Sequence, residues 1–209
     1  MIYRIIDLKE SLYDEKLFKK AYKEMSSQRQ EKADRYKQES DRKACVFADM
    51  LLRQMLKEAG YTQTPVFYKD EKGKPHLEND ELYFSISHSG EFVACAVSRH
   101  PVGIDIEKKR LVDLPLIKRV CTEEELSFVL SGSTDITEGG CERFLTLWCL
   151  KEAYLKYTGE GLVGGLKSIS FADNGKIKEN PLPHIKAESL RTEEYICAVI
   201  SEKNKVSEL

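Results

Sequence analysis

The segment Gly103-Ile104-Asp105-Ile106-Glu107 alternates apolar and acidic residues after a glycine. Side chains of a β-strand point alternately to its two faces, so this alternation predicts a strand. Ile104 and Ile106 are expected to face an apolar core, while Asp105 and Glu107 share the opposite face. The segment thus predicts a strand that presents two carboxylates side by side.

A second segment, residues 148–156, predicts a helix whose charged groups complement this strand. It reads Trp-Cys-Leu-Lys-Glu-Ala-Tyr-Leu-Lys, and in a helix Glu152 and Lys156 lie one turn apart on a common face. If the fold brings that face against the acidic face of the strand, three carboxylates and a lysine converge. Carboxylate oxygens suit a magnesium ion that also binds phosphate, and a lysine neutralises phosphate charge. The two segments together indicate a metal and phosphate site.

The composition is that of a globular protein without a strong overall charge. The chain has 209 residues, of which 41% are hydrophobic, enough to bury a core as one domain or as two small halves. Its net charge of -2 provides no overall attraction to nucleic acid or to a membrane. The N-terminus is too short and too charged for a signal peptide, and no apolar run is long enough to span a membrane, so we expect a cytoplasmic location. The six cysteines occur singly, which predicts reduced, buried thiols.

Apolar periodicity and chain breakers predict the order of helices and strands. In the first half we expect a strand at residues 1–8, helices at 12–25 and 30–59, and an antiparallel meander of strands at 82–87, 92–98 and 102–107, with His88 in a hairpin turn. In the second half we expect helices at 114–120, 123–130 and 142–157 and strands at 167–171, 176–178, 185–190 and 195–201.

The two halves repeat the order of a helix followed by a hairpin. In addition, Tyr195-Ile196-Cys197-Ala198-Val199 is similar to residues 92–97. We therefore expect an α+β fold of two similar α/β halves related by a pseudo-two-fold, each a small antiparallel sheet packed on a long helix. The predicted halves are residues 1–104 and 105–209, with the site at their junction.

Two further segments, Gly73-Lys74-Pro75 and Phe84-Ser85-Ile86-Ser87-His88-Ser89, precede the first two in the chain. In this order, the four segments resemble the phosphopantetheinyl transferases of the large, surfactin-synthetase-activating type. The resemblance implies the fold of that family. It also implies a reaction in which the 4′-phosphopantetheine arm of coenzyme A moves to a serine of an apo acyl or peptidyl carrier protein, releasing adenosine 3′,5′-bisphosphate. Magnesium is the implied metal, with manganese as the alternative, and the doubled halves imply a monomer.

The resemblance assigns roles to individual residues. Asp105, Glu107 and Glu152 are the implied metal ligands, and Glu152 is the base that takes the serine proton, a metal ligand, or both in turn. Lys156 is expected to contact the pyrophosphate of coenzyme A, and the implied catalytic set is Asp105, Glu152 and Lys156. The other contacts to coenzyme A are expected from Lys32, Arg42, Lys43, Lys74, Pro75, Ser87 and His88.

Several charged residues have two interpretations on sequence alone. Glu125 matches a further family acid close to the metal, but Thr122-Glu123-Glu124-Glu125 is also a capping box. Lys151 either belongs to the site or is solvated. The basic segments 108–110 and 118–119 either steer an acidic carrier protein or are ordinary surface charge.

Three other functions are alternatives to the implied one. The short, trimeric form of the same enzyme is disfavoured by the chain length. A metal-dependent phosphate-ester hydrolase also uses clustered carboxylates, but hydrolases with paired metals usually need more Asp and His than this chain has. A non-catalytic binder of coenzyme A or of a carrier protein is disfavoured because all three acids and Lys156 are present together.

Overall fold

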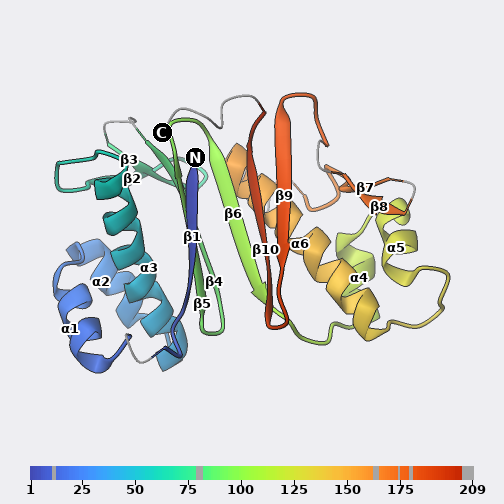
Figure 1. Ribbon diagram of the computed structural model, residues 1–209, viewed down its shortest axis with the longest axis horizontal. Coiled ribbons are helices and arrows are strands. Elements are labelled where there is room, and N and C mark those ends of the chain that lie inside the picture. The colour runs from blue at the N-terminus through green and yellow to red at the C-terminus, as the bar shows by residue number, and fades with distance from the viewer. Residues whose placement is uncertain (11–12, 79–81, 162–164, 174, 179–180, 204–209) are drawn as a thin grey trace.

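Two three-stranded antiparallel sheets form the centre of the computed structural model, which describes residues 1–10, 13–78, 82–161, 165–173, 175–178 and 181–203 (Figure 1). The first sheet has the order β1 (Ile2–Asp7), β5 (Phe92–Ser98) and β4 (Tyr83–Ser89). The second has the order β6 (Val102–Lys108), β10 (Tyr195–Glu202) and β9 (Ile185–Arg191). The α+β class is confirmed, with each sheet carrying its own helices.

The helices cover the outer sides of the two sheets, at opposite ends of the molecule (Figure 1). On the first sheet packs α3 (Glu39–Glu58), with α1 (Glu15–Lys23) and α2 (Ser27–Asp34) packed on that helix. On the second sheet packs α6 (Glu138–Thr158), with α4 (Leu114–Val120) and α5 (Glu123–Leu130) farther out. Two short hairpins complete the fold: β2 (Phe67–Lys69) with β3 (Pro75–Leu77), and β7 (Ala172–Asp173) with β8 (Lys176–Ile177). In the described residues, no helix is both long and apolar enough to cross a membrane.

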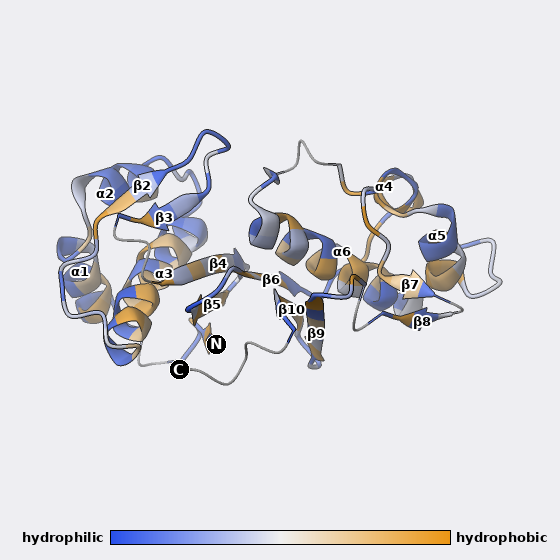
Figure 2. Cartoon of the chain, turned by 90° about the horizontal axis from the view of Figure 1, so that it is seen from above, coloured by the Kyte–Doolittle hydropathy of each residue, from blue (hydrophilic) through white to orange (hydrophobic). Residues whose placement is uncertain are grey.

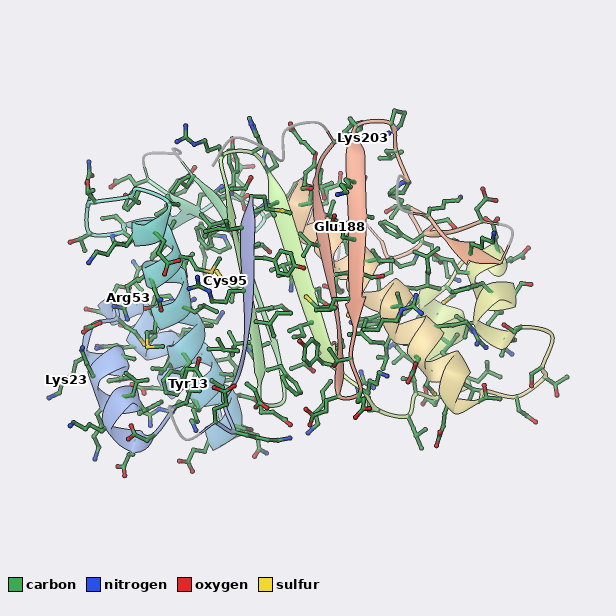
Figure 3. The ribbon with its side chains drawn as sticks, in the orientation of Figure 1. Tyr13, Lys23, Arg53, Cys95, Glu188 and Lys203 are labelled. Atoms are coloured by element: carbon green, nitrogen blue, oxygen red, sulfur yellow. The ribbon has the colours of Figure 1, made fainter. Side chains whose placement is uncertain are left out.

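Strand β5 is buried on both faces, which explains its unbroken apolar sequence. Val93, Cys95 and Val97 pack in the core formed with α3, and Figure 3 shows Cys95 between that helix and the strands. Ala94 and Ala96 face the other way and pack against β6 and β10. The two sheets therefore share an apolar contact through β5, and all six cysteines are free and buried, as expected.

The predicted meander of three consecutive strands is wrong at its last step. β6 pairs with β10 rather than continuing the first sheet. The reason is that β5 has only two edges, and β4 takes one of them while the N-terminal strand β1 takes the other. The predicted division between residues 104 and 105 falls within β6, and the division of the chain into these two halves stays a prediction.

Other boundaries differ from the prediction for local reasons. The helix expected at residues 30–59 is two helices, because α2 ends at Asp34 and α3 begins at Glu39. His88 lies within β4, opposite Val93, rather than in the hairpin turn. The strand expected at residues 167–171 is irregular backbone whose polar groups bind buried side chains, as described below. The helices expected at residues 114–120 and 123–130 are confirmed.

Candidate active site at the junction of the two sheets

The two acids of β6 share one face, as its alternation predicts. Ile104 and Ile106 are fully buried in the apolar contact between the sheets. Asp105 lies on the opposite face, where its side chain is nearly buried and Oδ1 accepts hydrogen bonds from Ser87 Oγ and from Lys156 Nζ, each at 2.7 Å. The predicted approach of the strand and the helix is therefore observed at Asp105.

Gly103 allows α6 to lie directly on β6. A Cβ atom at this position would lie 1.9 Å from the carbonyl oxygen of Ala153 and 2.6 Å from the amide nitrogen of Tyr157. Both contacts are with helix backbone, which cannot rotate away as a side chain can. The role of Gly103 was missed from the sequence, although a glycine inside a strand pattern often marks a close backbone approach.

Lys156 joins the helix to the strand. Its Nζ also donates to the carbonyl oxygen of Ile104, at 3.2 Å, so one ammonium group binds both the backbone and the carboxylate of neighbouring β6 residues. The side chain of Lys156 is 30% exposed, so the ammonium can still be reached from solvent. An ammonium in this position can bind an anion as well as Asp105.

Glu107 and Glu152 lie close enough to Asp105 for its negative charge to raise the pKa of each. Burial is the main factor that raises the pKa of the Glu107 carboxyl, and the negative charge of Asp105 adds to it. Burial and then Asp105 likewise raise the pKa of Glu152, while the Lys156 ammonium opposes the shift. A bound cation would offset the negative charge that raises the pKa of Glu107 and of Glu152.

One oxygen of Asp105 is the most direct indication of a cation site. Asp105 Oδ2 is buried and accepts no hydrogen bond. A buried carboxylate oxygen without a partner is energetically costly, and a bound cation would supply the missing contact. Within the described residues, no three His, Cys, Asp or Glu side chains are grouped closely enough to hold a metal ion by themselves. The unpartnered Oδ2 of Asp105 is a hard oxygen donor, the type that magnesium accepts together with water or substrate oxygens.

His88 and Lys74 approach this site from the N-terminal part of the chain. The His88 ring is half-buried with its centroid 6.1 Å from that of Tyr36, and burial lowers its pKa. Lys74 Nζ donates to the carbonyl oxygen of Tyr157, near the end of α6, at 3.0 Å, and burial lowers its pKa. Pro75, which follows Lys74, opens β3.

The three basic residues expected on α2 and α3 have different surroundings. Lys32 reaches solvent, but the protein atoms around its ammonium lower its pKa, and the charge of Arg29 adds to that effect. Arg42 instead pairs with Asp34 at 3.1 Å and stacks on the rings of Phe18 and Tyr22. Lys43 Nζ donates to the carbonyl oxygen of Leu8 at 3.3 Å. Arg42 and Lys43 are thus engaged in holding α3 against neighbouring segments, and their contact with coenzyme A stays a prediction.

Glu125 caps α5 and forms a buried ion pair. Its Oε2 accepts from the amide of Thr122 at 2.9 Å and from Lys151 Nζ at 2.8 Å, and its Oε1 accepts from the amide of Phe171 at 3.0 Å. Lys151 is fully buried and also donates to the carbonyl oxygens of Leu166 and Ile169. The solvated position considered for Lys151 is wrong. These contacts bind the backbone of residues 166–171, which is why no strand forms there.

Removing Lys151 is expected to destabilise the fold. Lys151→Met leaves the Glu125 carboxylate buried without its cation, so the free energy of unfolding should fall by about 3–5 kcal/mol. Urea denaturation of the variant measures this loss. The double variant Lys151→Met/Glu125→Gln should lose less, because it leaves no unpaired charge. A single variant as stable as the parent would contradict the ion pair.

Family models match almost the whole chain. The model described as 4′-phosphopantetheinyl transferase, N-terminal, matches residues 13–100, and the model described as 4′-phosphopantetheinyl transferase superfamily matches residues 101–200. The second match contains β6 and α6, and the first contains β4 and the hairpin of β2 and β3.

Curated proteins with related sequences have the same description. A 4′-phosphopantetheinyl transferase of Bacillus subtilis is 33% identical over 159 residues, which cover 73% of this chain and 69% of that protein. The 4′-phosphopantetheinyl transferase Sfp of B. subtilis strain 168 is 32% identical, with 70% and 65% covered. The 4′-phosphopantetheinyl transferase gsp of Aneurinibacillus migulanus is 33% identical, with 66% and 57% covered. The matches therefore span between about half and just over two thirds of these relatives. The matched segments include β6 with its acids and the helix α6 that contacts them. This chain belongs to the 4′-phosphopantetheinyl transferase superfamily.

Proposed function

We propose that this protein transfers the 4′-phosphopantetheine arm of coenzyme A to a serine of an apo acyl or peptidyl carrier protein. The products are the holo carrier protein and adenosine 3′,5′-bisphosphate. One observation carries the proposal: α6 places Lys156 on Asp105 of β6, in a half-buried site that also contains Glu107 and Glu152. Family membership supports the same reaction.

The acids and Lys156 have different electrostatic roles in the proposed reaction. Asp105, Glu107 and Glu152 are the residues that would hold a divalent metal, magnesium or alternatively manganese. When bound, that metal neutralises the pyrophosphate of coenzyme A and stabilises the leaving phosphate. Lys156 adds a positive charge beside Asp105, where it can contact a pyrophosphate oxygen.

Glu152 is the proposed base. In the described residues it forms no hydrogen bond to another side chain, and its raised pKa makes its carboxylate a better proton acceptor than an ordinary glutamate. The serine hydroxyl of the carrier gives its proton to Glu152 as its oxygen attacks the phosphorus nearer the pantetheine arm. The bond from that phosphorus to the bridging oxygen breaks, and adenosine 3′,5′-bisphosphate leaves with that oxygen.

The N-terminal part of the chain is proposed to bind the nucleotide. His88 lies on β4 beside Ser87, which itself contacts Asp105, so β4 connects the nucleotide end of the substrate to the metal acids. Lys32 and Lys156 both affect the His88 ring electrostatically, which supports a common anion-binding region. Lys74 and Pro75 would border the adenine from the β2–β3 hairpin.

Mass spectrometry tests the proposed reaction. The protein is mixed with coenzyme A, magnesium chloride and an apo carrier protein, and the carrier is then weighed. A gain of one phosphopantetheine group supports transfer. Release of free phosphate would support a hydrolase instead, and an unchanged carrier with bound coenzyme A would support a binding protein.

The carrier protein is proposed to approach over the basic segments 108–110 and 118–119. Lys108 pairs with Glu91 and Lys109 with Glu142, whereas Arg110 and Arg119 are exposed. Carrier proteins are typically acidic, so these exposed arginines, of which Arg110 acts electrostatically on Glu107, would steer them toward the site. The protein is proposed to act as a cytoplasmic monomer.

Reversing the charge of both arginines should slow the reaction with the carrier. Arg110→Glu/Arg119→Glu is expected to lower kcat/KM for the carrier by about tenfold or more at low salt, because steering affects the association rate. The KM for coenzyme A should not change. Lys16→Glu/Lys20→Glu on α1, at the other end of the molecule, makes the same change in net charge and serves as the control (Figure 1). Equal losses in the two double variants would exclude a local steering patch.

A further inference from the structure

Side-chain hydroxyls join the two sheets where β4 meets β6. In the described strands these two belong to different sheets, so no backbone ladder pairs them, although they lie side by side between the two groups of helices (Figures 1 and 2). Three serines of β4 span the gap. Ser85 Oγ accepts from the amide of Ile104 at 3.0 Å, Ser87 Oγ donates to Asp105 Oδ1 at 2.7 Å, and Ser89 Oγ donates to Glu107 Oε2 at 3.0 Å.

The three serines occupy alternate positions, so they lie on one face of β4. Phe84 and Ile86, at the other alternate positions, pack on the opposite face of β4, in the core that contains α3. Ser85 and Ser87 are buried, where a hydroxyl without a partner would be unfavourable. A serine combines a hydroxyl with a very small side chain, so β6 can approach closely while the hydroxyl still reaches it. We call these three residues the serine ladder.

We propose that the serine ladder positions the two acids of β6 for the metal. This role rests on the proposed function and adds Ser85 and Ser89 as positioning residues. In both acids a serine holds one carboxylate oxygen and leaves the other without a hydrogen bond from the described residues. For Asp105 that other oxygen is the buried Oδ2, and for Glu107 it is Oε1.

Ser87 thereby has a role in addition to the phosphate contact expected from the resemblance. A serine hydroxyl has one proton, and here that proton is donated to Asp105. Phosphate oxygens at neutral pH accept hydrogen bonds, so Ser87 cannot donate to a phosphate while it holds Asp105. In the ladder the Ser87 hydroxyl orients the acid, and its contact with a phosphate of coenzyme A stays a prediction.

Ser89 gives the clearest test, because it is half-buried and its hydroxyl contacts the acid. Residues that orient metal ligands typically contribute about 10- to 100-fold to metal affinity. We expect Ser89→Ala to weaken Mn²⁺ binding by about tenfold or more. Electron paramagnetic resonance of free Mn²⁺, titrated with protein and coenzyme A, measures that affinity without any turnover. Ser89→Thr keeps the hydroxyl and should restore most of the affinity.

A matched control separates positioning from general packing. Ser98 is also a buried serine of the first sheet, and its Oγ accepts from the amide of His100 at 3.1 Å, in the turn that follows β5. Ser98→Ala should bind Mn²⁺ as the parent does, and urea denaturation should place Ser89→Ala at or above the stability of Ser98→Ala. Suppose that the parent protein binds Mn²⁺ and modifies the carrier. If Ser89→Ala then binds Mn²⁺ as tightly as the parent does, the positioning role of the serine ladder is overturned and the proposed function is not. A parent that binds no Mn²⁺ would remove the proposed metal site, and the positioning role would fall with it.

Discussion

Replacing Glu152 with glutamine is expected to lower the transfer rate by about two to four orders of magnitude while the protein stays folded. Glutamine has nearly the same shape, but its amide cannot take a proton from the carrier serine and is a poor ligand for a hard cation. The mass of the carrier after timed incubation with coenzyme A and magnesium gives the rate. Glu138→Gln, an exposed change in the first turn of the same helix, should leave the rate unchanged.

The stability of this variant is not expected to fall with its activity. The pKa of Glu152 is raised in the folded protein, mainly by burial and then by Asp105. A raised carboxyl pKa means that the ionised form destabilises the fold at any pH above the unfolded pKa, and that this cost disappears as the pH falls and the group becomes protonated. At neutral pH the uncharged glutamine removes the cost, so Glu152→Gln should unfold at an equal or higher urea concentration.

The metal affinity of the same variant separates the two roles of Glu152. If Glu152 is only the base, the affinity for Mn²⁺ in the presence of coenzyme A should stay within about twofold while the rate falls. If it is a ligand, both should fall together. Turnover close to that of the parent would remove Glu152 from the mechanism altogether.

Local chemistry accounts for what could be predicted from the sequence. The alternation at residues 103–107 depends only on strand geometry, and it correctly places Asp105 on the face that meets Lys156. Helix α5 has a capping box at its start, so its beginning could be predicted from a few neighbouring residues. In both cases the determining contacts lie within one element.

Features that depend on distant segments could not be predicted in this way. The change of sheet at β6 follows from β1 occupying an edge of β5, and the sequence of residues 92–107 does not contain that information. Lys151 resembles a solvated lysine until residues 166–171 bring two carbonyl oxygens to its ammonium. Ser87 is part of a short polar string, and only the approach of β6 makes its hydroxyl a partner of Asp105.

Gly103→Ala is expected to disrupt the site from a position that carries no functional group. The new methyl group would lie 1.9 Å from the carbonyl oxygen of Ala153, so α6 and β6 must separate by about 1 Å or more to accept it. Overpacking of this kind typically costs about 1–3 kcal/mol of stability, and more where backbone must move. A displacement of about 1 Å in a catalytic geometry can lower the rate about 100-fold, so transfer should fall by at least that factor.

A glycine at the start of the same helix provides the control for Gly103→Ala. A Cβ at Gly139 would meet only the Nη1 atom of Arg143, at 3.5 Å, which is ordinary contact with a flexible side chain. Gly139→Ala should therefore keep the transfer rate and gain slightly in stability, because alanine favours a helix over glycine by about 0.5–1 kcal/mol. Hydrogen exchange should show loosened amides along β6 and α6 in Gly103→Ala alone. A Gly103→Ala protein with parental rate and stability would mean that the helix does not rest on the strand, and Lys156 could not then be held against Asp105.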